Sequence, residues 1–120
     1  MATILIVDPD PATRSLLELL ILRLGHRPIG QRELSEGEDP ELILLEPVSR
    51  AGMRLTRRLR DKLPQVPILC VSIDAPSWET RELGVVGYVM KPFRRSQLER
   101  ALEAALIPTP EVFEVRQSTA

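Results

Sequence analysis

The fold of this chain is decided by the stretch Thr3–Val7, with the sequence TILIV, which is followed directly by Asp8. All five residues have strong strand propensity or large apolar side chains, so both faces of an extended segment would be apolar or nearly so. Strands that are buried on both faces occur almost only in parallel sheets covered by helices. The stretch therefore predicts a buried parallel strand rather than an alternating edge strand.

Three further apolar runs share this arrangement, because each ends on a polar or charged side chain. They are 42–45 before Glu46, 66–71 before Ser72, and 88–90 before Lys91. Parallel strands bring their carboxyl ends to one edge of the sheet, and open α/β folds bind ligands and carry out chemistry outside that edge. The sequence therefore predicts one site that gathers these side chains with Asp8.

Helix signals lie between the runs. Asp10 and Pro11 predict the start of a helix, with the Asp10 side chain as N-cap, and Gly25 predicts its end. Further helices are predicted over 52–63 and 78–83 from the apolar spacing and the residues that end them. A last helix is predicted from about 96 to 106, where Ser96 and Glu99 fit a capping box.

The segment from 26 to 40 gives weak signals. Residues 26–30 predict a weak second strand, and residues 31–40 are polar with only Leu34 as a large apolar residue, so a loop or a single helical turn is expected there. With a fifth strand over 85–90, the pattern is α/β. It predicts a flavodoxin-like (βα)5 doubly wound parallel sheet with strand order 2-1-3-4-5, in which the second helix is short or absent.

Length and composition indicate one domain and exclude several classes. With 120 residues and 43% hydrophobic content, the chain is expected to form one domain over 1–106 and a C-terminal tail over 107–120. The net charge of −1 lacks the basic excess of a nucleic-acid-binding domain. No stretch has the length of a membrane span, and the N-terminus lacks a signal-peptide pattern, so a cytoplasmic protein is expected. Cys70, the single cysteine, is expected to pack as a small hydrophobe.

Together these fragments resemble the receiver domain of the response regulators of bacterial two-component signalling. The fragments, in order, are ILIVD at 4–8, Arg14 with Leu17, LILLE at 42–46, PILCVS at 67–72 and GYVMKPF at 87–93. The resemblance extends from Thr3 to about Leu106. It implies transfer of a phosphoryl group from a kinase histidine to an aspartate at the end of the third strand, with a divalent cation held by two adjacent acids after the first strand.

Four residues match the positions that sense the phosphoryl group in that family. The resemblance implies that Lys91 is the lysine that pairs with the charge, and that Ser72 is the hydroxyl residue. Tyr88 corresponds to the aromatic switch that turns inward on activation. Pro92 corresponds to the proline that usually follows a cis peptide bond.

Two positions depart from the family pattern. Glu46 stands in place of the phosphoacceptor aspartate, and its carboxylate reaches on the order of 1.5 Å further because of one extra methylene. Pro9 stands in place of the second metal-binding acid. Magnesium is therefore expected to bind weakly at most, through Asp8 and Asp10, and no other cofactor is expected. Asp10 has helix capping as its alternative role, and Asp8 has an ion pair with Lys91.

These departures predict a stand-alone receiver-like module of a phosphorelay that is not phosphorylated at the usual site and has no enzymatic activity. It would act through contacts with a histidine kinase or a downstream effector. One alternative is a magnesium-dependent, phosphorylatable receiver, and another is a small flavodoxin-like ligand-binding protein or enzyme. The last is disfavoured because the turn at 8–11 has no glycine to cradle a phosphate.

Three features have two interpretations each. Glu46 either imitates a phosphorylated aspartate by reaching Lys91 and Ser72, or only pairs with Lys91 in a decayed site. The leucine-rich first helix, with Leu16 and Leu19 outside its main stripe, is either deeply buried or forms a homodimer or partner surface. A face of the third helix either is simply solvated or attracts nucleic acid or an acidic partner; its basic residues are Arg50, Arg54, Arg57 and Arg58.

Overall fold

The computed structural model describes residues 1–47, 50–74 and 77–106, so the predicted tail at 107–120 lies outside the described residues. Five parallel strands form one sheet in the order β2-β1-β3-β4-β5, as predicted. The strands are β1 (Thr3–Val7), β2 (Arg27–Ile29), β3 (Leu42–Leu45), β4 (Ile68–Ser72) and β5 (Gly87–Met90). The fold class and the strand order predicted from the sequence are therefore confirmed.

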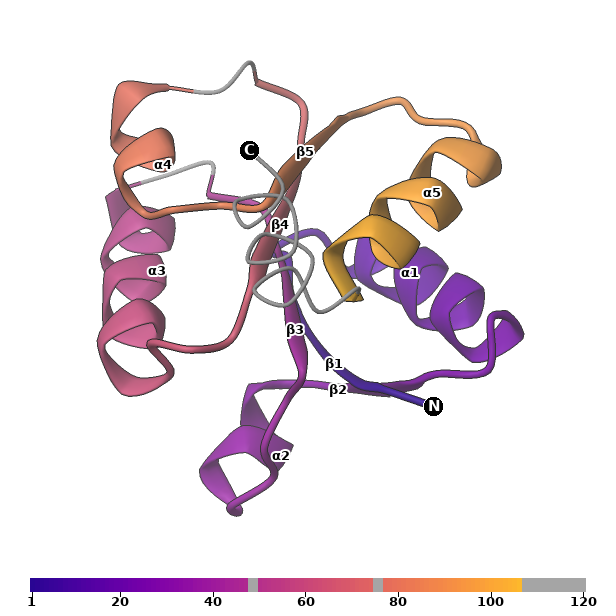
Figure 1. Ribbon diagram of the computed structural model, residues 1–120, viewed down its shortest axis with the longest axis horizontal. Coiled ribbons are helices and arrows are strands. Elements are labelled where there is room, and N and C mark those ends of the chain that lie inside the picture. Colours follow the sequence, from indigo (N-terminus) through magenta and orange to yellow (C-terminus); the bar gives the residue numbers. More distant parts are fainter. Residues whose placement is uncertain (48–49, 75–76, 107–120) are drawn as a thin grey trace, which may run out of the picture.

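Helices cover both faces of the sheet (Figure 1). They are α1 (Pro11–Arg23), α2 (Gln31–Ser35), α3 (Arg50–Lys62), α4 (Trp78–Glu82) and α5 (Arg95–Leu106). Helices α1 and α5 lie side by side on one face, while α3 and α4 lie on the other (Figure 1). The helix α2 has only five residues, which confirms that the second helix is short.

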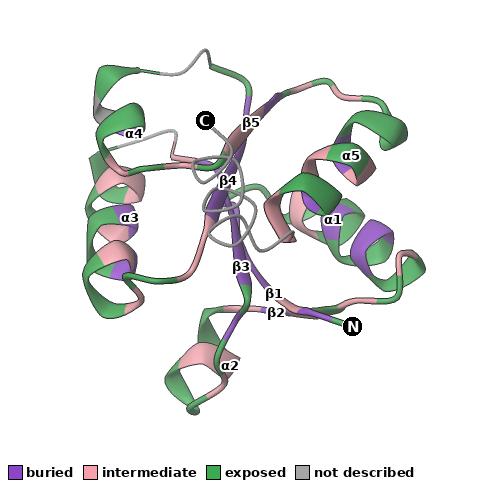
Figure 2. Ribbon diagram, in the orientation of Figure 1, coloured by how far each residue is buried: buried purple, intermediate pink, exposed green. Residues whose placement is uncertain are grey.

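The core consists of two layers, one on each side of the sheet. Alternate residues of β1 point to opposite layers: Ile4 and Ile6 join the layer under α1 and α5, and Leu5 and Val7 join the layer under α3. Strands β1, β3 and β4 are buried along nearly their whole length (Figure 2). This two-sided burial is why these runs are continuously apolar rather than alternating.

The strand register aligns the carboxyl ends of the four strands that carry the predicted site. Val7 lies beside Leu45, Leu45 beside Cys70, and Cys70 beside Tyr88. The residues that follow these positions therefore leave the sheet along one edge. A parallel sheet without bulges at this edge keeps the four strand ends in register.

Local sequence signals explain most of the helix boundaries. The Asp10 side chain caps α1, and Pro11 occupies its first helical position, as predicted. After α1 and α4 the chain turns through Gly25 and Gly84, whose φ angles of 86° and 69° lie in the left-handed region that favours glycine.

Two helix starts differ from the prediction. Helix α3 begins at Arg50, two residues earlier than expected. Helix α5 begins at Arg95, so Ser96 lies inside the helix and does not cap it. Instead, the Gln97 side chain accepts a hydrogen bond from the Arg94 backbone N–H at 2.6 Å. Gln97 thus supplies the returning half of a capping box that is shifted by two residues.

Arg60 fixes the end of α3 against the neighbouring segments. Its guanidinium donates to the carbonyl oxygens of Leu83 (3.1 Å), Pro64 (3.2 Å) and Val66 (2.9 Å). Leu83 follows α4, and Pro64 and Val66 lie in the connection into β4, so one planar donor group satisfies three carbonyl oxygens. The contact holds α3 and α4 on the same face of the sheet.

The outward face of α1 departs from the expectation of deep burial. Leu17, Leu20 and Ile21 are buried, but Leu16, Leu19 and Leu22 are 48%, 45% and 58% exposed. The interpretation of the first helix as deeply buried is therefore wrong for Leu16 and Leu19, because α1 packs on the sheet and α5 through one face only. No helix in the described part of the chain is long and apolar enough to cross a membrane.

We predict that two leucine truncations in α1 separate these environments. Leu17→Ala should lower the free energy of unfolding by about 2–5 kcal/mol, because it leaves a cavity in the core. Leu19→Ala should change it by no more than about 0.5–1 kcal/mol, because this side chain is nearly half exposed. Urea denaturation monitored by circular dichroism measures both values, and equal losses would contradict the exposure of Leu19.

Candidate functional site

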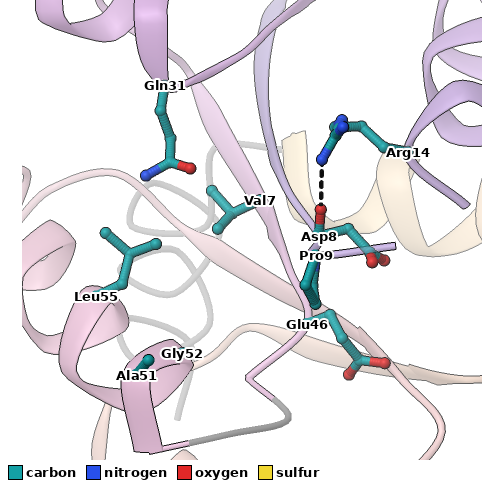
Figure 3. A pocket seen from close by; sticks show the side chains of 9 residues that line it. All are labelled: Val7, Asp8, Pro9, Arg14, Gln31, Glu46, Ala51, Gly52 and Leu55. Atoms are coloured by element: carbon teal, nitrogen blue, oxygen red, sulfur yellow. Dashed lines mark hydrogen bonds between the residues drawn. The ribbon is translucent and has the colours of Figure 1, made fainter. Parts of the chain in front are cut away.

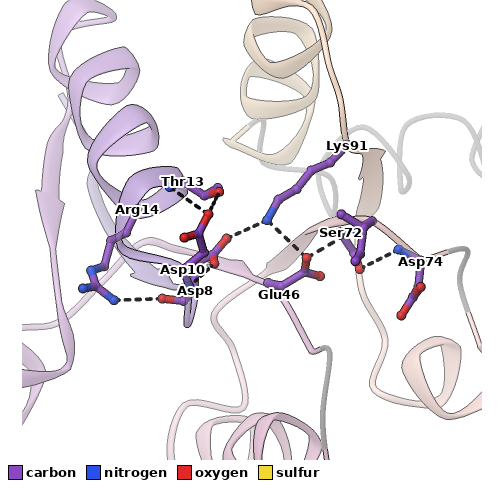
Figure 4. Close-up of polar contacts among 9 residues, drawn as sticks. Asp8, Asp10, Thr13, Arg14, Glu46, Ser72, Asp74 and Lys91 are labelled. Atoms are coloured by element: carbon purple, nitrogen blue, oxygen red, sulfur yellow. Dashed lines mark hydrogen bonds and ion pairs between the residues drawn. The ribbon is translucent and has the colours of Figure 1, made fainter.

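The carboxyl edge of the sheet brings together three charged side chains (Figure 4). The Lys91 ammonium lies 2.8 Å from Asp8 Oδ2 and 3.1 Å from Glu46 Oε1. Asp8 follows β1, Glu46 follows β3 and Lys91 follows β5, so one lysine ties three strand ends together. This is the convergence that the order of the strands predicted.

Both carboxylates are almost completely removed from water, since Asp8 and Glu46 are each 5% exposed. Burial by itself would lower the pKa of Lys91. The hydrogen bonds and negative charges of Asp8 and Glu46 outweigh this effect and raise the pKa of Lys91 above 10.5. The lysine is therefore a permanent cation at neutral pH, shared between two buried anions.

Glu46 has a second contact that the sequence did not reveal. Its Oε1 atom also accepts a hydrogen bond from the Ile73 backbone N–H at 3.3 Å. Its other oxygen, Oε2, is buried and has no hydrogen-bond partner among the described residues. The Ile73 donor is a main-chain group just after β4, so no residue type marks it, and only the strand register could have indicated it.

Asp10 is used as a helix cap. Its Oδ2 atom accepts hydrogen bonds from the Thr13 hydroxyl at 2.6 Å and from the Thr13 backbone N–H at 3.3 Å. The Thr13 hydroxyl lowers the pKa of the Asp10 carboxyl. Asp8 is occupied as well, because its Oδ1 atom accepts from the Asp10 backbone N–H at 2.9 Å while Oδ2 binds Lys91. Among the described residues, no cluster of three metal-ligating side chains is present.

Ser72 and Tyr88 are connected to Asp74 rather than to Glu46. The Ser72 hydroxyl oxygen accepts from the Asp74 backbone N–H at 3.1 Å, and the Tyr88 hydroxyl donates to the Asp74 carbonyl. Tyr88 is half-buried against the core, and this burial raises its pKa. The peptide bond between Lys91 and Pro92 is cis, as the resemblance implies.

A cavity of about 260 Å³ lies beside this cluster, between β1, α2 and α3 (Figure 3). Its walls are mostly apolar, and six of its lining residues are Val7, Pro9, Gln31, Ala51, Gly52 and Leu55. In Figure 3 the carboxylates of Asp8 and Glu46 point away from Leu55 and Gln31, toward the Lys91 side. The edge of the sheet thus has a charged side and an apolar side.

Cys70 lies under the cluster and has no access to solvent. Burial, together with the negative charge of Glu46, raises the pKa of its thiol to about 12. The thiol therefore stays protonated at neutral pH. This confirms that Cys70 packs as a small hydrophobe.

Sequence comparison finds regulatory proteins. No family model matches the chain. It is 30% identical over 119 residues to the transcriptional regulatory protein AfsQ1 of Streptomyces coelicolor, covering 88% of the chain and 52% of that protein. It is 29% identical over 117 residues to the positive alginate biosynthesis regulatory protein of Pseudomonas aeruginosa, covering 88% and 47%. The chain thus spans about half the length of the curated relatives it matches.

Structure comparison finds receiver folds at low sequence identity. A response regulator from Thermotoga maritima superposes with a TM-score of 0.76 and 19% identity, over 88% of this chain and 98% of that one. The receiver domain of the sensor histidine kinase PA1611 from Pseudomonas aeruginosa, which has magnesium in its active-site cleft, superposes with a TM-score of 0.74 and 24% identity. It is matched over 88% of this chain and 97% of its own.

The fold, the cluster of Asp8, Glu46 and Lys91 at the strand ends, and the relatives together define the class of the protein. The chain is a receiver domain of the response-regulator class of two-component signalling proteins.

We predict that removing the shared cation destabilises the domain strongly. Lys91→Met should lower the free energy of unfolding by about 3–5 kcal/mol, because two buried carboxylates lose their counterion. Adding Glu46→Gln should restore part of this loss, because it removes one of the uncompensated charges. Urea denaturation at neutral pH measures the two variants against the unmodified domain.

The pH dependence provides the control. Because the pKa of Lys91 is raised in the folded state, its contribution is complete below pH 10.5 and is lost as the pH rises through the higher folded value. The difference in stability between the unmodified domain and Lys91→Met should therefore be constant up to that pH and shrink above it. A difference that is already lost at neutral pH would contradict the shared ion pair.

Proposed function

We propose that this domain is a pseudo-receiver, which signals through protein contacts without phosphorylation at the usual position. The observation that carries the proposal is the state of Glu46. The residue at the acceptor position is a glutamate, it is buried, and its Oε1 atom is held by both Lys91 and the Ile73 amide.

Phosphoryl transfer requires an acceptor oxygen in line with the phosphorus and a cation to neutralise the equatorial oxygens. Glu46 fits this requirement poorly, because its Oε1 atom is engaged and its Oε2 atom is buried. The groups that would hold magnesium fit no better. Pro9 has no carboxylate, Asp8 is bound to Lys91, and Asp10 caps α1. We therefore derive no step that uses magnesium, and we expect its binding to be weak.

Glu46 supplies part of what a phosphorylated aspartate would supply. It reaches the lysine and a main-chain amide after β4, but the Ser72 hydroxyl is bound to Asp74 instead. A carboxylate also has fewer acceptor oxygens and less charge than a phosphoryl group. We infer that Glu46 holds the strand ends in one fixed arrangement, so that the domain presents a constant surface rather than a phosphorylation-dependent one.

This function requires protein partners rather than a reaction. The domain would meet a histidine kinase or a downstream effector in the bacterial cytoplasm and would have no enzymatic activity of its own. A phosphorylatable receiver is the second candidate, because Asp8 and Lys91 are both retained.

We predict that the domain takes up no phosphoryl group from a small phosphodonor. After incubation with acetyl phosphate and magnesium, the intact mass should remain unchanged, because Glu46 cannot present an oxygen in line and the cation is held weakly. A receiver domain with the complete acidic set, treated in parallel, provides the positive control. A stoichiometric gain of one phosphoryl group would establish the second candidate instead.

We also predict that magnesium binding returns when both departures are reversed. The variant with Glu46→Asp and Pro9→Asp should bind magnesium at least about tenfold more tightly than the unmodified domain, because a second carboxylate is restored and the acceptor is shortened. Isothermal titration calorimetry measures the change. Glu46→Asp alone is the matched control and should recover little, since Pro9 still replaces a ligand. Equal binding by all three proteins would show that Pro9 and Glu46 do not limit the site.

A further inference from the structure

The outward face of α3 carries an unusual concentration of positive charge. Its exposed basic residues are Arg50, Arg54, Arg57, Arg58 and Lys62, and Asp61 is its one acidic residue. The first turn of α3 contains no acidic side chain, and Arg50 stands at its start. A cation at this end is opposed by the positive end of the helix dipole. Arg50 is therefore placed against local helix stability, whereas the dipole effect does not extend to Arg54, Arg57 and Arg58 further along the helix.

Three of these arginines have no described partner within the domain. Some exposed arginines elsewhere are paired, as Arg27 with Glu38 and Arg95 with Glu99, whereas Arg23 and Arg100 have no ion pair among the described residues. Across residues 1–47, 50–74 and 77–106, no ion pair or hydrogen bond involves the side chains of Arg50, Arg54 or Arg58. Their charge is available to a group outside the chain.

The charged face borders the apolar cavity. A helix advances 100° per residue, so Ala51 and Arg58 lie on the same side of α3, and Arg54 lies between that side and solvent. Ala51 and Leu55 line the cavity, together with Val7 of β1. Arg54 and Arg58 do not themselves line the cavity; they are exposed neighbours of Leu55 on α3, one position before it and three positions after it. The short helix α2 forms the opposite side through Gln31, its first residue.

We propose that this surface, defined by Arg50, Arg54 and Arg58 with the adjoining cavity, binds an acidic segment of a partner protein that inserts one aromatic side chain. The cavity volume of about 260 Å³ exceeds the roughly 150 Å³ that accommodates benzene in an engineered apolar cavity, so a phenyl ring fits. Acidic residues on either side of the ring would meet the arginines. The inference rests on the proposed function, because it names the surface through which a domain without phosphorylation makes a protein contact.

A protein partner agrees with the observations better than a nucleic acid does. The chain has a net charge of −1, so a long polyanion is not attracted beyond the α3 face. The cavity lining combines aliphatic side chains with the charged residues Asp8, Arg14 and Glu46, and among the described residues it includes no aromatic ring on which a base could stack. A short acidic segment with an apolar anchor uses the local charge and the cavity together.

The test uses the full chain and a fluorescein-labelled peptide with one central phenylalanine between six glutamates. Fluorescence anisotropy should detect saturable binding that weakens with salt. Arg54→Glu with Arg58→Glu should weaken binding at least about tenfold. Replacing the peptide phenylalanine by alanine should also weaken it about tenfold, because the ring no longer fills the cavity. Ala51→Phe, which fills the cavity from the protein side, should have the same effect.

The matched control is Arg23→Glu with Arg100→Glu. These exposed arginines lie on α1 and α5, on the opposite face of the sheet, and the change in net charge is identical. This control should bind within about twofold of the unmodified domain. Equal losses in both double variants, no effect of the alanine peptide, absence of saturable binding, or tighter binding of single-stranded DNA of equal charge would each overturn the proposal. Phosphorylation in the mass measurement would contradict the pseudo-receiver function and leave these binding results unaffected.

Discussion

The carboxyl edge of the sheet depends on the two ion pairs that the Lys91 ammonium makes with the buried carboxylates of Asp8 and Glu46. They join residues that are 83 and 45 positions apart in the sequence and that follow three different strands. Two buried anions and one cation leave a negative excess in a region of low dielectric constant. The Asp10 and Ile73 amides offset part of it by donating to these carboxylates. The arrangement persists only while all these groups stay in register.

This constraint divides the edge of the sheet into two sides with different chemistry. On one side, the carboxylates turn toward Lys91 and away from solvent. On the other side, the stems of the same residues join Val7, Pro9 and Leu55 around an apolar cavity. Glu46 contributes to both sides, because its longer side chain places the carboxylate beside Lys91 and the carboxylate points away from the cavity. Replacing a metal-binding acid by Pro9 has the same consequence, since a carboxylate is exchanged for an apolar ring. Under the proposed function, the place for phosphate and metal that the resemblance implies holds an ion cluster beside a pocket.

The retained residues support a protein that keeps the form of a receiver while it departs from the chemistry. Lys91, Ser72, Tyr88 and the cis bond before Pro92 occupy the expected positions. Ser72 and Tyr88 meet at Asp74, whereas Glu46 meets Lys91 and Ile73. Among the described residues, no direct hydrogen bond joins Glu46 to Ser72 or Tyr88. The pKa of Tyr88 is raised first by burial and also by the negative charge of Glu46, so a charge change at Glu46 would reach Tyr88 directly as well as through the short segment after β4. The missing hydrogen bond supports the proposal of a domain with one state instead of two.

The fold class, the strand order and the identity of the residues at the carboxyl edge could all be predicted from the residues. These follow from local periodicity, from the Asp10 and Pro11 helix start, and from the rule that parallel strands end together. How the charges pair could not be predicted, because hydrogen bonds such as that from the Ile73 amide involve main-chain groups that carry no sequence signature. The tertiary structure also decided that Gln97 and not Ser96 helps to cap α5, and that Leu16 and Leu19 face outward. Capping and exposure depend on which neighbouring element lies within a few ångströms, and that is a property of packing in three dimensions rather than of residue order.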